Sequence, residues 1–127
     1  MVKQKRLTES QILVLDEKLT RLMTVDQLFL DNELGLPVLA KSLGATSNEV
    51  SWLINEIHHD NFYNFINKYR IGEAKKLLLS EQYQKLNIIG IAYQSGFNSK
   101  TTFNQAFKKH TGQSPTDFVK RNAIKEA

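Results

Sequence analysis

An internal repeat limits the folds open to this chain more than any other feature of its sequence. Ala40 and Gly44 recur as Ala92 and Gly96, at an offset of 52 residues. One residue is then inserted, and the offset becomes 53 for four further pairs: Thr46 with Ser99, Val50 with Phe103, Ile54 with Phe107, and Phe65 with Phe118. Each copy therefore holds a short helix with a central alanine, a glycine turn, a capping hydroxyl, and apolar residues four and eight positions after the cap.

Most of the chain has the pattern of α-helices. Between residues 12 and 22, leucine or isoleucine recurs every three or four positions, as on one face of a helix. The two prolines, Pro37 and Pro115, stand where helices can begin. Alternation typical of strands is not sustained anywhere. We therefore predict an all-α fold with about seven helices, at about residues 10–25, 36–42, 46–57, 61–79, 87–94, 99–110 and 114–121.

The repeat and these helices together predict two helix-turn-helix subdomains, with one long helix between them in the sequence. A central alanine lets the second helix of each pair cross closely over the first, and glycine takes the backbone through the turn. The apolar anchors fix one face of the second helix and leave its first turns exposed, as in a recognition helix that enters the DNA major groove. The predicted segments are an arm with a leading helix (1–30), a first helix-turn-helix (31–60), the long helix (61–80), a second helix-turn-helix (81–121) and a tail (122–127).

Basic residues are concentrated in the second half of the chain. Residues 1–60 hold six Lys or Arg against nine Asp or Glu, a balance of −3. Residues 61–127 hold eleven against four, a balance of +7. A basic half on a small domain is typical of nucleic-acid-binding proteins, although a solubilising surface would carry the same charge. Two repeat copies in a basic chain favour DNA binding over the alternative, a helical hairpin repeat that serves only packing.

Several classes of site are not predicted. The chain has no cysteine, which excludes disulfides and thiolate metal sites. No nucleophile motif, phosphate-binding loop or cofactor fingerprint occurs, so we expect neither an enzyme nor a cofactor. The segment His58-His59-Asp60 is not predicted to bind a metal, because adjacent residues do not share a helix face. The apolar runs are too short for a membrane span or a signal peptide, which predicts a cytoplasmic protein.

Several separated motifs resemble the AraC/XylS family of transcription regulators. The run from Ile89 to Ser99 (IGIAYQSGFNS) resembles the C-terminal signature of that family, together with Phe103, Phe107-Lys108-Lys109, Thr111-Gly112 and Ser114-Pro115. Residues 61–70 (NFYNFINKYR), with Ala74 and Leu77-Leu78, are similar to its central linker helix. The resemblance covers about residues 30–121. It implies two helix-turn-helix subdomains joined by a long linker helix. Their recognition helices would enter successive major grooves, about one helical turn apart on one face of the duplex.

Carried over residue by residue, the resemblance implies a set of DNA contacts. The bases would be contacted by Lys100, Thr101, Thr102 and Gln105 in the second recognition helix, and by Asn48, Ser51 and Trp52 in the first. Glutamine and asparagine can bind adenine, lysine favours guanine, and a threonine methyl can contact thymine. Lys108 and Lys109 suit phosphate groups. Two alternatives stay open: Thr101 and Thr102 as plain surface residues, and Trp52 packed on the linker helix.

The first half of the chain departs from the family pattern at several places. His59 stands where the family has glycine, at the position that matches Gly112, and predicts a weaker left-handed cap and a less regular turn. The acidic balance of this half predicts looser docking of the first unit on DNA. Three basic residues lie between Met1 and Arg6, either in a DNA-contacting arm or in an unstructured terminus.

The predicted function is a sequence-specific, DNA-binding transcription regulator. The expected partners are double-stranded DNA and, since the family resemblance favours activation, RNA polymerase. Family members commonly carry a sensor or dimerisation domain, so the chain is either a fragment of a longer regulator or a stand-alone monomer on an asymmetric site. The alternative is a helical protein–protein interaction module, which would show apolar or aromatic anchors on the exposed face of the 99–110 helix.

Overall fold

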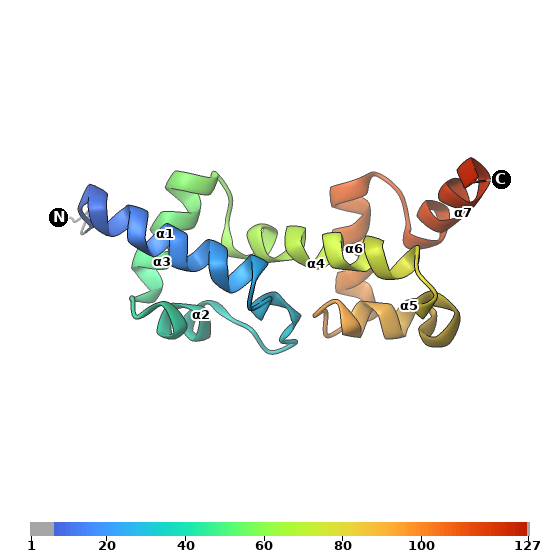
Figure 1. The fold of residues 1–127 in the computed structure, drawn as a ribbon, viewed down its shortest axis with the longest axis horizontal. Helices are drawn as coiled ribbons and strands as arrows, with labels where there is room; N and C mark the ends of the chain where they lie inside the picture. The colour runs from blue at the N-terminus through green and yellow to red at the C-terminus, as the bar shows by residue number, and fades with distance from the viewer. Residues whose placement is uncertain (1–6, 127) are drawn as a thin grey trace. The chain divides into compact units, whose positions relative to one another are not determined.

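The fold is helical throughout the part of the chain that the structure describes (Figure 1). A computed structural model describes residues 7–126, and for residues 82, 84 and 123–126 it describes only the backbone. The elements within this range are α1 (Glu9–Thr24), the short 3-10 helix η1 (Leu28–Leu30), α2 (Leu36–Leu43), α3 (Ser47–His58), α4 (Phe62–Leu78), α5 (Gln82–Gln94), α6 (Lys100–Thr111) and α7 (Pro115–Glu126). The prediction of an all-α fold with about seven helices is confirmed.

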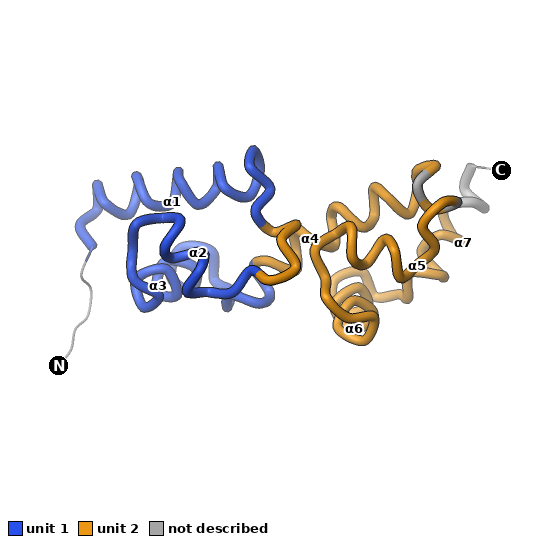
Figure 2. Tube along the Cα trace, turned by 90° about the horizontal axis from the view of Figure 1, so that it is seen from below, with its two compact units in different colours: residues 1–28, 34–65 blue, residues 29–33, 66–127 orange. Residues whose placement is uncertain are grey.

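The chain forms two compact units, each with one helix-turn-helix motif (Figure 2). Unit 1 comprises the described residues up to Leu28 together with residues 34–65, and it contains the motif α2–α3. Unit 2 comprises residues 29–33 and the chain from Ile66 onward, and it contains the motif α5–α6. The helix α4 begins in unit 1 and continues into unit 2. Residues 29–33, from the connection between α1 and α2, are therefore part of the second unit.

Unit 1 has an aliphatic core. The helices α1, α2 and α3 each bury a row of residues three or four positions apart, which is the spacing of one helix face. The buried residues are Leu15, Leu19, Met23, Leu34, Leu39, Ala40, Leu43, Val50, Leu53, Ile54 and Phe65. The repeat positions Val50 and Ile54 are fully buried. They anchor α3 at the places where the sequence predicts anchors.

Unit 2 is built around a row of phenylalanine rings. Phe97 and Phe103 meet edge to face with ring centroids 5.2 Å apart, Phe103 and Phe107 lie at 5.7 Å, and Phe107 and Phe118 lie at 5.4 Å. The remaining members of this core cluster are Ile71, Ala74, Leu78, Ile91, Ala92 and Ala106. The repeat pairs Val50 with Phe103, Ile54 with Phe107, and Phe65 with Phe118 thus occupy buried positions in both units.

The helix caps predicted from the sequence are present. The Glu49 backbone N–H donates to Thr46 Oγ1 (3.1 Å), and the Thr46 N–H donates to Glu49 Oε1 (3.0 Å), which completes a capping box. The Thr102 N–H donates to Ser99 Oγ (3.1 Å) at the start of α6. Gly44 and Gly112 end α2 and α6 in the left-handed conformation, with φ of 69° and 83°.

The turn after α3 corrects one prediction. His59 adopts the left-handed conformation (φ 56°, ψ 43°) that glycine takes in the second copy, and its N–H donates to Asn55 O (3.1 Å). The Asp60 N–H reaches Ile54 O at 3.4 Å. The prediction of a less regular turn at this place was therefore wrong. These capping hydrogen bonds and the burial of Ile54 hold the turn in place, although the conformation is costly for a residue with a Cβ.

Two helices differ in length from their predicted spans. The helix α5 begins at Gln82 and is kinked at Asn87, which has φ 50° and ψ 179°. Asn87 Oδ1 accepts the Gly90 N–H at 2.9 Å, so the predicted helix start at residue 87 is a capped start inside α5. The helix α7 continues to Glu126, past the predicted end near Arg121. The predicted basic arm, residues 1–6, lies outside the described residues.

The glycines of the two helix-turn-helix turns have different surroundings. A Cβ placed on Gly44 would have no heavy atom within 4 Å. A Cβ placed on Gly96 would lie 2.2 Å from Phe29 O, 2.8 Å from Arg70 Nε and 3.2 Å from Leu30 Cα. Both residues have positive φ, at 69° and 105°. Backbone conformation alone therefore requires Gly44, whereas Gly96 is required both by conformation and by the close approach of residues 29–30.

We predict that His59→Gly stabilises the protein. Relief of the left-handed strain is worth about 1–2 kcal/mol, and the flexibility of glycine in the unfolded chain offsets about half of that gain. The expected net increase in the free energy of unfolding is about 0.5–1 kcal/mol, measured by urea denaturation. His59→Ala is the matched control and should give no increase. An equal increase in both variants would show that the His59 side chain, and not its backbone conformation, is unfavourable.

We predict that Gly96→Ala is more destabilising than Gly44→Ala. Alanine at residue 44 meets only the conformational penalty of roughly 1 kcal/mol. Alanine at residue 96 must also displace the backbone of residues 29–30, which raises the expected loss to about 3 kcal/mol or more. Circular dichroism during urea denaturation measures both losses. Equal losses would contradict the packing of residues 29–30 against the second turn.

Candidate nucleic-acid interface

The helix α6 presents the predicted DNA-contacting residues on one exposed side. Its other side is fixed by the buried residues Phe103, Ala106 and Phe107. The predicted contacts that the structure leaves exposed on α6 are Lys100, Thr101, Thr102, Gln105, Lys108 and Lys109. Because helix positions three and four apart are neighbours, these side chains form a continuous polar surface along the helix.

Asn104 joins this surface although the sequence analysis did not select it. Lys100, Asn104 and Lys108 are spaced four residues apart, and all three line an open depression of about 430 Å³ beside α6. Ile88 and the segment Ser114–Thr116 complete its lining. The repeat contains the signal that would have found Asn104, because Ser51 in the first copy matches residue 104 at the offset of 53.

Thr102 differs from the other exposed residues of α6. Ser99 Oγ donates a hydrogen bond to Thr102 Oγ1 (2.9 Å) and accepts the Thr102 backbone N–H (3.1 Å). Thr102 thus holds the place that Glu49 holds in the capping box of the first copy. Its hydroxyl stabilises the start of α6, which makes Thr102 less available for a base than Thr101 or Gln105.

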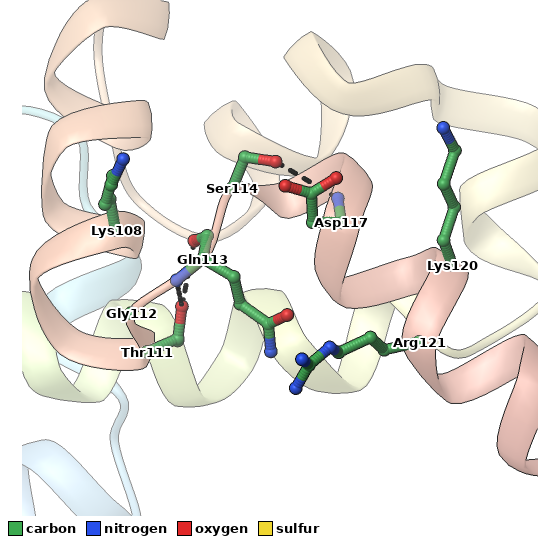
Figure 3. A pocket seen from close by; sticks show the side chains of 8 residues that line it. All are labelled: Lys108, Thr111, Gly112, Gln113, Ser114, Asp117, Lys120 and Arg121. Carbon is green, nitrogen blue, oxygen red and sulfur yellow. Dashed lines mark hydrogen bonds between the residues drawn. The ribbon is translucent and has the colours of Figure 1, made fainter.

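A basic pocket lies between the end of α6 and the start of α7 (Figure 3). It encloses about 470 Å³, and Lys108 of α6 lines it together with Lys120 and Arg121 of α7. Asp117 is the acidic residue in this lining, and its backbone N–H donates to Ser114 Oγ at 3.1 Å. Neither Lys120 nor Arg121 is among the DNA contacts predicted from the sequence.

The helix α3 presents a different set of side chains. Asn48 is exposed, while Ser51 and Trp52 are partly buried. The opposite face is fixed by Val50, Leu53 and Ile54, so the three predicted contacts lie on the side of α3 away from the core.

The helices α3 and α6 have opposite net charge. Between Lys100 and Thr111, α6 carries three lysines and no acidic residue. Between Ser47 and His58, α3 carries Glu49 and Glu56 and neither lysine nor arginine. A polyanion such as DNA is therefore attracted more strongly to α6 than to α3.

The histidine pair His58–His59 has structural contacts. His58 Nε2 donates to Asp16 Oδ1 of α1 at 2.6 Å, and the His58 ring lies 5.0 Å from the Phe65 ring. Among the residues whose placement is described, no group of three or more His, Cys, Asp or Glu could hold a metal ion. Within the same part of the chain, no helix has the length and apolar character needed to cross a membrane.

Known proteins share this arrangement. A family model described as a helix-turn-helix domain matches residues 39–121, a range that includes both α3 and α6. The C-terminal domain of AraT, a response regulator from Geobacillus stearothermophilus, is similar with a TM-score of 0.72 and 26% identity. That likeness covers 92% of this chain and 88% of the other. The chain belongs to the AraC-type helix-turn-helix family. The resemblance found in the sequence is confirmed.

Further comparisons show the same fold and relatives of similar sequence. A transcriptional regulator with an AraC-type DNA-binding domain from Chromobacterium violaceum shares the fold, with a TM-score of 0.66 at 18% identity over 85% of this chain and 96% of the other. An uncharacterized HTH-type transcriptional regulator of Staphylococcus aureus (strain COL) is 29% identical over 109 residues, 86% of this chain. The HTH-type transcriptional regulator AlkR of Acinetobacter baylyi is 32% identical over 80 residues, 63% of this chain. The chain spans 14% and 25% of the length of these last two relatives.

We predict that Lys108→Gln and Lys120→Gln each weaken DNA binding equally for all sequences. Each lysine that neutralises a phosphate releases counterions, so its loss should lower the slope of log K against log salt concentration by about 0.9. Fluorescence anisotropy with two unrelated duplexes over a range of salt concentrations measures the slope. Lys18→Gln on α1 is the matched control and should leave the slope unchanged. A slope that changes equally in all three variants would mean that only net charge matters.

Proposed function

We propose that the chain binds a specific site on double-stranded DNA through both α3 and α6, placed in successive major grooves. The observation that carries this proposal is the two-sided character of α6. One side is anchored by fully buried phenylalanines, and the other presents polar and basic side chains. A second copy of the same motif, α2–α3, supports a bipartite site with two short sequence boxes about one helical turn apart.

The base contacts of α6 are assigned to the first two turns of the helix. Gln105 can bind adenine with two hydrogen bonds, and Lys100 can donate to guanine O6 and N7. The Thr101 methyl suits a thymine methyl, and Asn104 adds a second amide for adenine. Thr102 is assigned a smaller part because of its hydrogen bonds to Ser99.

The base contacts of α3 are assigned to Asn48, Ser51 and Trp52. Asn48 can bind adenine, and Ser51 can donate to or accept from any base edge. The exposed part of Trp52 can contact a thymine methyl or a sugar. Because α3 brings two glutamates and no lysine to the duplex, we propose that unit 1 docks more loosely than unit 2.

The phosphate contacts are assigned to the basic end of the α6–α7 region. Lys108 and Lys109 are exposed at the end of α6, and Lys120 and Arg121 face the pocket that Lys108 also lines. Such contacts position a protein on the duplex and contribute affinity without sequence preference. Because these residues all lie on α6 and α7, they support tighter docking of the second unit than of the first.

In the whole protein, this DNA-binding domain would serve transcription regulation. The relatives named as transcriptional regulators support that role, and activation through contact with RNA polymerase is the mode we propose. The chain spans a small part of these relatives, which supports a sensor or dimerisation domain in the complete regulator. We propose no enzymatic activity, and we place the protein in the cytoplasm, where its DNA target lies.

The alternative function is a protein–protein interaction module. Such a module needs apolar or aromatic anchors at the centre of its docking face. The exposed side chains described on α6 are instead lysine, threonine and glutamine. The exposed face of α6 therefore favours DNA over a protein partner.

Selection of bound duplexes from a randomised library, at near-physiological salt, tests the proposed function. Two enriched boxes about one helical turn apart would support bipartite binding. One enriched box would mean that only one unit recognises sequence, against the bipartite proposal. Absence of enrichment, with no binding at low salt either, would favour the interaction module.

We predict that Gln105→Ala relaxes the preference at one base pair of the selected site. The expected cost on the preferred duplex is about 1–3 kcal/mol, while duplexes with other bases at that position lose little. Competition binding with duplexes substituted at each position measures the effect. Lys108→Ala is the control and should weaken binding to all these duplexes alike. An unchanged base preference in Gln105→Ala would show that the assigned face of α6 is wrong.

A further inference from the structure

The connection between α1 and α2 forms part of the second unit. Phe29 is 4% exposed, and its ring stacks on the ring of Tyr69 in α4 with centroids 5.6 Å apart. Residues 29–33 group with unit 2, although they precede its other residues by more than thirty positions (Figure 2). Residues 29–33 are therefore packed into the second unit, with Phe29 buried against α4.

Arg70 binds this segment to the turn between α5 and α6. Its Nε donates to Phe29 O (2.7 Å), and its Nη2 donates to Asp31 O (3.0 Å). Its guanidinium also lies over the Phe97 ring, 5.7 Å from the centroid. Burial lowers the pKa of Arg70, and the nearby Asp31 carboxylate opposes that shift. Arginine remains charged at neutral pH, so both hydrogen bonds are charge-assisted.

Asn32, in the same segment, binds the backbone on both sides of this turn. Its Nδ2 donates to Phe97 O (2.8 Å) and to Tyr93 O (3.2 Å). Tyr93 lies in the last turn of α5, and Phe97 follows the glycine of the α5–α6 turn. One amide group therefore joins the two sides of this turn. An amide nitrogen has two hydrogens to donate, and both are used here. Asn98 Nδ2 adds a longer bond to Asn32 O at 3.4 Å.

The start of α6 follows directly from this turn. Phe97 is separated from Lys100, the first residue of α6, by only two residues. The side chains proposed to contact bases lie in the next two turns of the helix. Contacts to bases tolerate errors of only about 0.5 Å in position, so the support around a binding helix decides its precision.

We propose that Asn32 and Arg70 are positioning residues that fix the conformation of the α5–α6 turn. Through this turn they fix how α6 fits the sequence box that it contacts, here called the second box. This inference rests on the proposed function of α6 as a recognition helix. It concerns the second unit alone, because the matching turn of the first unit is open around Gly44. Base preference in the second box should thus depend on residues far away in the sequence that contact no DNA.

The first test uses Asn32→Ala, with the exposed Gln94→Ala of α5 as a matched control. Affinities are measured for the selected duplex and for versions with either box scrambled. Loss of two hydrogen bonds should lower the preference for the intact second box about tenfold. Preference for the first box and non-specific binding should stay unchanged. Equal loss for both boxes, or no loss, would overturn the inference.

The second test needs no DNA and keeps the inference separate from the proposed function. Hydrogen–deuterium exchange is compared between the wild-type chain and the variants. Asn32→Ala should speed exchange in residues 93–102 and leave the α2–α3 turn, residues 41–49, unchanged. Unchanged exchange in residues 93–102, or equally faster exchange in both turns, would overturn the inference. If the wild-type chain shows no duplex preference, the proposed function fails. The exchange result alone then decides whether Asn32 positions the α5–α6 turn.

A second variant covers the case in which Asn32→Ala unfolds unit 2. Arg70→Lys keeps the charge but loses the planar fork that binds two carbonyls at once. We expect Arg70→Lys to act in the same direction as Asn32→Ala. Preference for the second box should fall selectively, and hydrogen exchange in residues 93–102 should become faster. A fully folded Arg70→Lys protein with wild-type preference and exchange would count against the positioning role.

Discussion

A row of four phenylalanine rings, two of them from α6 itself, holds α6 in the core of unit 2. Phe103 and Phe107 are fully buried and join Phe97 to Phe118. Because a helix has one face to bury, fixing these residues directs the polar side of α6 outward. Val50 and Ile54 orient α3 in the same way. The apolar anchors, more than the polar residues that they expose, therefore decide which side chains a duplex could meet.

The two copies of the motif differ in their cores, their charges and the surroundings of their turns. Unit 2 combines an aromatic core, a basic helix and a turn held by Arg70 and Asn32. Unit 1 combines an aliphatic core, an acidic helix α3 and a turn with open space around its glycine. On the proposed function, unit 2 would supply most of the electrostatic affinity. Unit 1 would add a second box and hence a longer specific site.

Local patterns in the sequence predicted much of the fold, and long-range contacts account for what was missed. Helix caps such as Thr46 with Glu49 depend on residues three apart, and buried anchors depend on helix spacing, so both are visible in the sequence. The bonds from Asn32 to Tyr93 and Phe97 span 61 and 65 residues, and no local pattern indicates them. The prediction of a less regular turn at His59 was wrong because the preference for glycine reflects only backbone strain. Surrounding contacts can outweigh that strain. Among the candidate contacts, Asn104 could have been predicted from the repeat, because it matches the predicted contact Ser51.

Nuclear magnetic resonance can detect whether both α3 and α6 contact one duplex, as we propose. The isotope-labelled chain would be titrated with the selected duplex, and backbone amide shifts would be followed along the sequence. We expect the largest changes at the starts of α3 and α6 and around the basic pocket of Lys108, Lys120 and Arg121. Changes confined to α6 would contradict bipartite binding. Changes centred on α1, with neither recognition helix affected, would contradict the proposed interface altogether.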